Sequence, residues 1–352
     1  GTGVVTGAHN TAVGYVAGNS LTSGVSNTFT GVVAGNSTTT GSYNSGFGRG
    51  SLQNNTTASN NTAVGYNSLT ANTTGAYNVA LGRSALSANT TASYNSALGA
   101  DALVTNTAGS SNVAVGYNAL NANTTASNNT AVGTGAGLSV TTGGSNTLIG
   151  TGAGDAITSG TTNTLVGYNT GTYQNDIITG TANVIFGAYS TGTSTSANDQ
   201  HGFGYNLDCA SNFTTLGAGS SDSRLAHGGT TWAAVSDERY KKDITDSTVG
   251  LSFINALRPR TFNYKNKGEL PNTFRAYKEN SSEVFKSAQT QHGFIAQEIK
   301  QAIDADSGIA DGFKLWDERE DGSQEVAEAA LIPMLVKAIQ ELTARLETLE
   351  GK

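Results

Sequence analysis

The sequence predicts a mainly β N-terminal part, a parallel β-solenoid or β-roll with 17-residue coils, followed by an α+β domain that ends in a short coiled coil. Three observations lead to this fold class. Asparagine recurs with a step of 17 through the first half of the chain. The composition changes sharply at Ser236, because all lysines, glutamates and prolines follow it. The chain ends in an isoleucine and leucine pattern with alternating steps of three and four.

Each repeat begins with asparagine and has glycine four residues later. The clearest copy begins at Asn112 and reads NVAVGYNALNAN, with Gly116 at the fifth position. An eleventh copy starts three residues late at Asn183, and a degraded twelfth starts at Gln200. A step of 17 suits one coil of a solenoid. The regular copies begin at Asn10, Asn27, Asn44, Asn61, Asn78, Asn95, Asn112, Asn129, Asn146 and Asn163.

Two apolar positions in each coil predict two short strands with inward side chains. The first precedes the glycine, as Val115 does, and is apolar in every copy except the one with Thr30. The second position comes five residues later and is apolar or glycine, as at Leu69, Leu86, Leu103 and Leu120. The glycines would supply positive φ or close backbone approach, and the asparagines would form ladders along the axis. Because such a core is thin, we expect coils to stack and several chains to pack together.

The change in composition predicts the domain organisation. Residues 1–235 contain no lysine or glutamate, three arginines and six aspartates, whereas the remaining residues contain 16 Lys+Arg and 20 Asp+Glu. A shift of this size indicates two differently built domains. We expect a solenoid over residues 1–205, a short irregular neck over 206–235, and a separate domain over 236–352.

Several classes of function are disfavoured by composition. The net charge of −7 argues against a nucleic-acid partner, and no apolar run approaches 18 residues, so no membrane insertion is expected. No His, Cys, Asp or Glu cluster has metal-ligand spacing, so we expect neither a metal nor a cofactor. The single cysteine, Cys209, is expected to be a small buried residue.

A row of large polar side chains follows the repeat glycines. These residues sit at one regular height in the solenoid, which permits a ligand-contacting stripe because tyrosine stacks on sugars and proteins. The alternative, which we favour, is a solvated or inter-chain packing row. Its members are Tyr15, Arg49, Tyr66, Arg83, Tyr117, Tyr168 and Tyr205.

The border between the domains carries a candidate for nucleophilic chemistry. Ser236 and Lys241 are five residues apart in the stretch SDERYKK. A serine hydroxyl becomes a nucleophile when a base takes its proton, and a buried lysine can be that base. The alternative is structural, with the serine as a helix N-cap and Lys241 and Lys242 on a solvated face.

Three motifs in order resemble the self-cleaving intramolecular chaperone domain of phage tailspikes, tail fibres and neck appendages, of which the endosialidase type is best known. They are SDERYKK at 236–242, HGFIAQE at 292–298 and AIQEL at 338–342. The resemblance implies that residues 236–352 drive trimerisation and then cut themselves off between Val235 and Ser236. It makes Ser236 the nucleophile and Lys241 its base, with Lys242 as the alternative base.

The domain after the border reads as a mixture of elements. Residues 250–257 have helical spacing, 261–264 alternate like a strand, and 265–290 show no period. The resemblance implies that this last segment is an arm that grips the folding fibre. His292 is either a third catalytic member or, as we favour, a buried and hydrogen-bonded histidine before a strand at 293–295 and a helix at 296–303.

The end of the chain has the a/d pattern of a coiled coil, and its mixed isoleucine and leucine permit a trimer. The pattern positions are Ile332, Leu335, Ile339, Leu342, Leu346 and Leu349. The repeat NTAVGYxA resembles the head repeats of trimeric autotransporter adhesins, which form left-handed parallel β-rolls. The repeat here is longer than the adhesin repeat.

Three functions are compatible with these patterns. The favoured one is a virion tail fibre that forms a homotrimer, binds a glycan or protein receptor on the host cell surface, and matures by autoproteolysis with no other catalytic activity. A bacterial trimeric surface adhesin should end in a membrane-anchoring segment rather than a coiled coil. A polysaccharide-degrading tailspike would need a carboxylate pair, and the repeat region offers only irregularly placed aspartates.

Overall fold

The chain divides into two compact units. The computed structural model describes residues 5–172, 176–234, 236–309 and 313–351. The first, the solenoid unit, comprises Gly1–Ser236, and the second, the C-terminal unit, comprises Asp237–Lys352.

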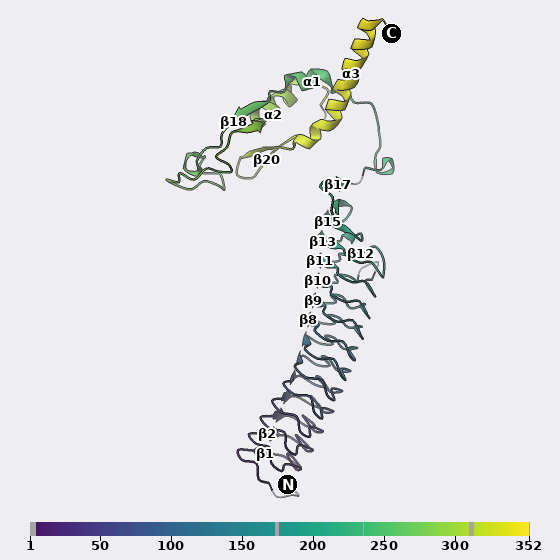
Figure 1. The fold of residues 1–352 in the computed structure, drawn as a ribbon, viewed down its shortest axis with the longest axis vertical. Coiled ribbons are helices and arrows are strands. Elements are labelled where there is room, and N and C mark those ends of the chain that lie inside the picture. The colour runs from purple at the N-terminus through teal and green to yellow at the C-terminus, as the bar shows by residue number, and fades with distance from the viewer. Residues whose placement is uncertain (1–4, 173–175, 235, 310–312, 352) are drawn as a thin grey trace. The chain divides into compact units, whose positions relative to one another are not determined.

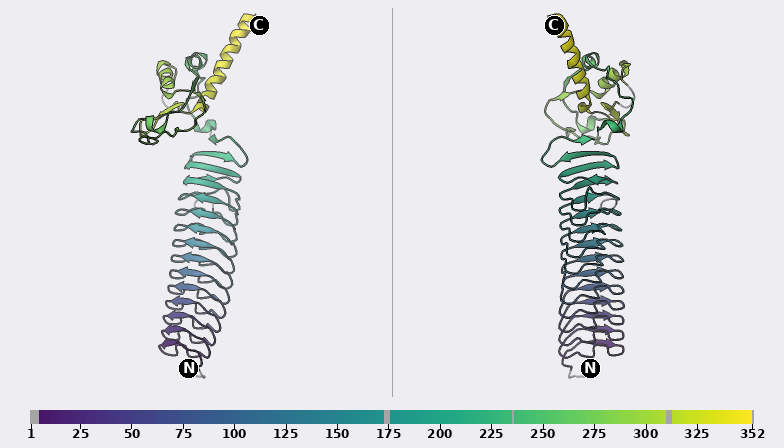
Figure 2. Two further views of the ribbon diagram at one scale, coloured as in Figure 1. Left: turned by 60° about the vertical axis from the view of Figure 1, so that its left-hand side comes forward. Right: turned by 90° about the vertical axis from the view of Figure 1, so that its right-hand side faces the viewer.

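The solenoid unit is a stack of about 12 coils of about 17 residues, joined by one long sheet (Figure 1; Figure 2). Neighbouring strands are parallel, and the register steps by one repeat, so that Ala97 lies opposite Ala114. The predicted solenoid is therefore confirmed. Its strands are β1 (Thr11–Val13), β2 (Thr28–Thr30), β3 (Ser45–Phe47), β4 (Thr62–Val64), β5 (Val79–Leu81), β6 (Ser96–Leu98), β7 (Val113–Val115), β8 (Thr130–Val132), β9 (Thr147–Ile149), β10 (Thr164–Val166), β11 (Val184–Phe186), β13 (His201–Tyr205) and β15 (Phe213–Ala218).

The second predicted strand of each coil is wrong for most of the stack. Within the described residues, a second sheet contains only β12 (Thr191–Gly192) and β14 (Asp208–Cys209), in the last coils. In earlier coils the corresponding leucine has positive φ, as at Leu103 (51°) and Leu120 (50°). A residue in that conformation turns the chain. The leucine is still buried, so the position is a core position on a turn.

In the five coils that carry this leucine (Leu52, Leu69, Leu86, Leu103 and Leu120), the core is formed by the middle residue of the strand and by the leucine. Ala97 and Ala114 are completely buried in β6 and β7, and Leu103 and Leu120 face them from the turn. The prediction that the residue before the glycine points inward is wrong, because alternation along a three-residue strand turns its two ends outward. We call the outward row before the glycines the apolar stripe: Val13, Phe47, Val64, Leu81, Leu98, Val115, Val132, Ile149, Val166, Phe186, Phe203 and Leu216, with Thr30 in the second coil.

The predicted asparagine ladder is confirmed. Oδ1 of Asn95 accepts hydrogen bonds from the backbone N–H of Asn112 (3.0 Å) and from its Nδ2 (3.1 Å), while Nδ2 of Asn95 donates to the carbonyl of Gly109 (2.9 Å). A second buried ladder runs through Asn55 and Asn72, whose side chains bond at 2.9 Å. Both ladders satisfy polar groups that would otherwise be buried without partners.

The repeat glycines allow adjacent coils to approach each other closely. Gly116 has φ of 133°, and a Cβ atom there would overlap the carbonyl of Gly133 in the next coil. The same relation holds between Gly133 and Gly150. Glycine is therefore required at this position by both conformation and space.

The end of the solenoid unit changes from parallel to antiparallel pairing. β15, within the predicted neck, pairs in parallel with β13, and then β16 (Ser221–Ala226) and β17 (Ala233–Ala234) add antiparallel strands. The predicted irregular neck thus consists largely of regular strands. Cys209 is completely buried in β14, as expected, and burial raises the pKa of its thiol to about 12.

The C-terminal unit is an α/β region with a helix at its end. Its core joins Val249, Phe253, Ile299, Ala302, Leu315 and Leu331. Its elements are the 3₁₀ turn η1 (Glu238–Tyr240), α1 (Leu251–Ala256), β18 (Arg260–Phe262), η2 (Lys267–Glu269), β19 (Gln291–Gly293), α2 (Ala296–Ala305), β20 (Trp316–Glu318), β21 (Gln324–Val326), η3 (Glu328–Leu331) and α3 (Ile332–Glu350). The strands pair antiparallel, β18 with β19 and β20 with β21.

Helix α3 confirms the predicted C-terminal helix. Pro333 lies in its first turn, where a missing N–H costs nothing, and Gly351 ends it in the left-handed conformation. Its a/d side chains are exposed in the single chain, from Ile332 to Leu349. Among the described residues, no helix is long and apolar enough to cross a membrane.

Candidate functional site

The predicted catalytic residues lie where the two units meet in the sequence. Ser236 is the last residue of the solenoid unit, and Lys241 and Lys242 belong to the C-terminal unit. All three are exposed. Val235, on the other side of the predicted scissile bond, lies outside the described residues. The dyad and the cleavage site therefore stay predictions.

Between Ser236 and Lys241 the chain forms one 3₁₀ turn, and its cap is Asp237. The Asp237 carboxylate accepts hydrogen bonds from the backbone N–H of Arg239 (2.9 Å) and from its Nε (2.9 Å). The Arg239 side chain and N–H hold the pKa of this carboxyl below its usual range. The structural alternative for Ser236, an N-cap, is wrong, because the next residue takes that role. The backbone N–H of Lys241 donates a hydrogen bond to the carbonyl of Glu238 (2.9 Å), which closes the turn.

His292 lies on β19, opposite Thr261 of β18. Its side chain is exposed, and its Nδ1 lies 3.2 Å from the hydroxyl of Thr261. The predicted hydrogen bond is confirmed, but the predicted burial is wrong, because the ring occupies the outward position of a short edge strand. Within the described ranges no group of His, Cys, Asp or Glu could hold a metal ion.

The motif HGFIAQE contributes a clamp that the sequence analysis missed. Glu298 on α2 accepts two hydrogen bonds from Arg260 of β18, from Nε (2.9 Å) and Nη2 (2.5 Å), and Arg258 lies 3.4 Å from the same carboxylate. The Arg260 contact holds the pKa of Glu298 below its usual range. The sequence contained a signal for this clamp, because Arg258 and Arg260 lie just before and at the start of a strand and Glu298 is the acidic residue of the HGFIAQE motif. The clamp fixes α2 against β18.

The segment 265–290, which shows no sequence period, is held by local contacts. Asn266 and Glu269 form a capping box around η2, and Lys267 pairs with Glu283 at 2.5 Å. The backbone N–H of Arg275 donates to Asp321 in the turn between β20 and β21 (3.0 Å). Hydrogen bonds from Ser323 and from the Arg275 backbone lower the pKa of Asp321 to about 2.

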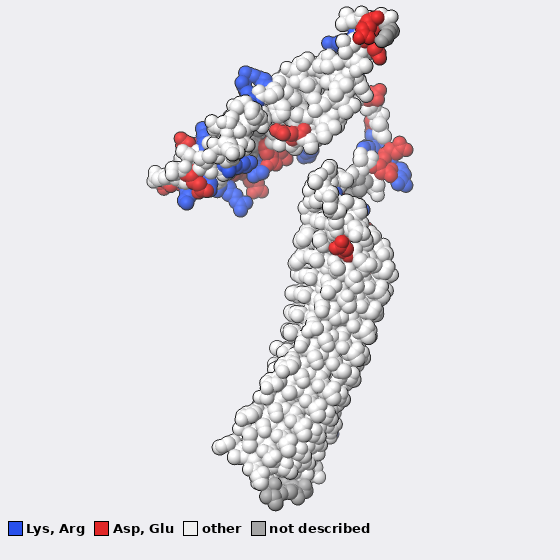
Figure 3. Space-filling model, in the orientation of Figure 1, with Lys and Arg blue, Asp and Glu red and all other residues white. Residues whose placement is uncertain are grey.

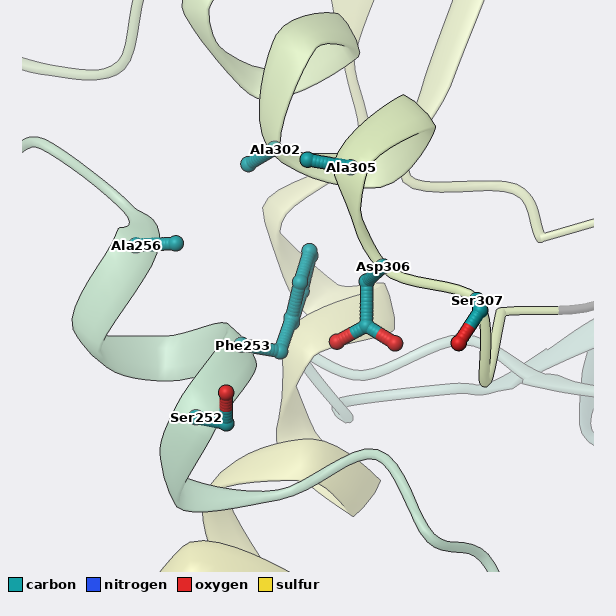
Figure 4. Close-up of a pocket in the computed structure, with 7 residues that line it drawn as sticks. All are labelled: Ser252, Phe253, Ala256, Ala302, Ala305, Asp306 and Ser307. Carbon is teal, nitrogen blue, oxygen red and sulfur yellow. The ribbon is translucent and has the colours of Figure 1, made fainter.

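A pocket of about 260 Å³ lies between α1 and the end of α2 (Figure 4). Ser252, Phe253 and Ala256 line one side, and Ala302 and Ala305 line the other. The Asp306 carboxylate already accepts a hydrogen bond from the backbone N–H of Gly308 (2.8 Å). None of the predicted catalytic residues lines this pocket, so it offers no support for the dyad.

Charged residues are concentrated in the C-terminal unit, whereas the solenoid unit contains few of them. On the face shown in Figure 3, acidic and basic atoms gather beyond the solenoid coils, which show a single acidic patch. The row after the repeat glycines is exposed at Tyr15, Tyr117 and Tyr205, and Arg49 lies over the ring of Tyr66 at 5.6 Å. Such a row can contact a ligand, water or another chain, and both sequence interpretations stay open.

Comparison with known proteins identifies one family. Residues 236–307 match the family model described as chaperone of endosialidase, well under half of the chain. No curated protein matches the chain, and no solved structure does. The match and the β-solenoid together fit a tail fibre with a C-terminal chaperone domain. They support a phage tail-fibre-type protein with an intramolecular chaperone, and the matched family implies autoproteolytic activity for a domain of this kind.

Proposed function

We propose that this chain is the subunit of a homotrimeric phage tail fibre or appendage, whose residues 236–352 direct assembly and then leave by self-cleavage between Val235 and Ser236. The observation that carries this proposal is the position of the family match. It begins at Ser236, which is also the last residue of the solenoid unit. In this scheme residues 1–205 are the shaft and 206–235 are its neck.

The proposed reaction is an acyl shift followed by hydrolysis. Ser236 Oγ attacks the carbonyl carbon of Val235, the C–N bond breaks, and an ester joins Val235 to the Ser236 side chain. Lys241 takes the hydroxyl proton and returns it to the departing amino group of Ser236. Water then hydrolyses the ester, which leaves a carboxylate on Val235 and restores the serine hydroxyl.

The exposure of Lys241 makes assembly part of the mechanism. A lysine accepts a proton only in its neutral form, which burial and nearby cations favour. Lys241 is exposed in the single chain, so we propose that the association of three chains supplies the burial. Cleavage would then occur only in a correctly assembled fibre, and the released fibre would be kinetically trapped because its folding template has left.

Helix α3 supports a homotrimer. Its a/d residues form an exposed apolar face, with Ile339 62% and Leu346 57% exposed. A helix with such a face is stabilised by packing against copies of itself. Assembly around α3 would bring three chaperone domains together. The released shaft would then remain on the virion and contact a glycan or protein receptor of the host.

Mutants separate the chemistry from assembly. Ser236→Ala and Lys241→Ala should assemble but remain a single 352-residue chain, whereas Lys242→Ala and the control Ser282→Ala should still cut. Replacing Leu342 and Leu346 by Asp should abolish both assembly and cleavage. A denaturing gel beside light scattering of the native protein measures both. A 235-residue fragment from Ser236→Ala, or an assembled wild type that never cuts, would contradict the proposal.

A further inference from the structure

The apolar stripe covers an outward face of the solenoid in the single chain. Leu81 is 47% exposed and Phe203 is 42% exposed, and the rings of Phe186 and Phe203 stack at 5.4 Å. Two residues earlier in each strand lies a second row, mostly uncharged threonine and serine, which includes the exposed Val79 and Val113. A continuous exposed apolar face of this length is rare on a monomeric protein and marks an interaction surface.

The spacing of the stripe restricts what can cover it. Apolar side chains follow one another at every coil except the second, which has Thr30, about 4.8 Å apart along the axis. A surface that matches this rise over every coil must itself be a stack of β-strands with the same period. Another copy of this solenoid has that period, and none of the stripe positions carries a charge that would oppose like against like.

The size of the face also suits a second copy. Thirteen parallel strands span roughly 60 Å, and two outward rows are about 10 Å across, which gives several hundred Å² per neighbour. A stable interface buries about 800 Å² per partner. The solenoid face alone supplies most of that area, and the exposed a/d face of α3 adds to it in the uncleaved chain. Use of both surfaces by the same copies requires the chains to run parallel.

We propose that the apolar stripe is the surface along which solenoids of this protein pack, parallel and coil against coil. This rests on the proposed function only for the number of chains. It gives the mature fibre an interface of its own, separate from the chaperone domain. The shaft therefore stays assembled after residues 236–352 are released, since the contacts that hold it lie between β1 and β15.

Cysteine protection in the full-length chain, kept uncut by Ser236→Ala, tests this surface. Leu98→Cys places a thiol in the stripe, and Thr91→Cys places one at an exposed turn of the same solenoid. Cys209 is buried, with a thiol pKa raised to about 12, so it should not react. In the native protein, maleimide should modify Leu98→Cys at least about tenfold more slowly than Thr91→Cys, because reaction requires opening of the interface. Both should react equally after denaturation.

Oxidation by dissolved oxygen with copper identifies the occupant. Leu98→Cys should form a disulfide between two chains, and Thr91→Cys should not. Modification of Leu98→Cys as fast as Thr91→Cys, or protection in a monomer, would overturn the inference. Leu342→Cys on α3 serves as the reference. If it is protected in a trimer while Leu98→Cys reacts freely, the proposed function stands and the stripe is not the interface. A monomer in every variant would overturn both.

Discussion

The two units of this protein are stabilised in different ways. The solenoid unit repeats similar contacts from coil to coil, namely a buried residue in the middle of the strand, a leucine or glycine on the following turn and an asparagine ladder, and it contains few charged residues. The C-terminal unit makes each contact once, as in the clamp between Glu298 and Arg260. The comparison teaches that a repeat can build a long structure from weak coils, whereas a unit that folds around one core needs specific partners.

The largest effect should come from breaking the period. Deleting residues 78–94 removes one whole coil and should leave the solenoid folded, because every later residue keeps its register. Deleting residues 78–85 moves every later asparagine and glycine half a coil out of step and should abolish the solenoid fold. Circular dichroism during heating measures both variants. Equal melting temperatures of the two variants would contradict a solenoid whose coils stack in a fixed register.

A glycine pair tests the close approach of adjacent coils. Gly133→Ala should cost on the order of 4 kcal/mol of unfolding free energy, because φ of 138° is strained for alanine and the new Cβ would overlap the Gly150 carbonyl. Gly135→Ala is the matched control, since its φ is 65° and nothing lies within 4 Å. It should cost about 1 kcal/mol. Chemical denaturation of the two variants gives the difference, which should shrink to the difference in backbone strain alone if the coils are not in contact.

An asparagine pair tests the second ladder. Asn55→Ala removes the acceptor for Nδ2 of Asn72 and the donor to the Ala58 carbonyl, both buried. The unfolding free energy should fall by about 1–3 kcal/mol because a buried amide loses its partner. Asn54, the exposed neighbour, should tolerate alanine within about 0.5 kcal/mol. A similar loss at both positions, measured by the same denaturation, would mean that the ladder adds nothing.

Acid should affect the two units unequally, though the effect is the smallest. The pKa of Asp321 is lowered to about 2 in the folded protein, so its ionised form stabilises the C-terminal unit. That contribution is complete above the unfolded pKa of about 3.9 and is lost as pH falls toward 2. In the solenoid unit burial raises the pKa of the Asp155 carboxyl. Protonation of Asp155 in acid therefore removes an unfavourable buried charge and does not destabilise this unit.

The acid comparison has its own measurement. Thermal unfolding followed by the helix signal should show the C-terminal unit losing stability between about pH 4 and pH 2. Asp321→Asn should flatten part of that loss, and Asp246→Asn, at an exposed position, should not. If both variants follow the wild-type curve, the hydrogen bonds to Asp321 from Ser323 and from the Arg275 backbone do not contribute.

The sequence by itself determined the period, the asparagine ladder, the C-terminal helix and the border at Ser236. These properties are local or repeated, so the asparagine step of 17 and the a/d pattern predict them without knowledge of the tertiary structure. It also pointed to Ser236 and Lys241 through a resemblance, and their chemistry is still a prediction. The 3₁₀ turn after the border is capped by Asp237. Residue type alone could not distinguish a cap at Asp237 from a cap at Ser236, because aspartate and serine are both common N-cap residues.

Only the tertiary structure decided which side of each strand faces the core. A period of two says that neighbours such as Ala114 and Val115 point to opposite faces, but not which face is inside. The coil closes tightly through a leucine with positive φ, and its interior accepts alanine at Ala114 while Val115 lies outside. The side chains before the glycines, such as Val115, are predicted to lie inside, but they lie outside. The clamp at Glu298 and the exposure of His292 were decided in the same way, because they depend on segments that meet across the chain.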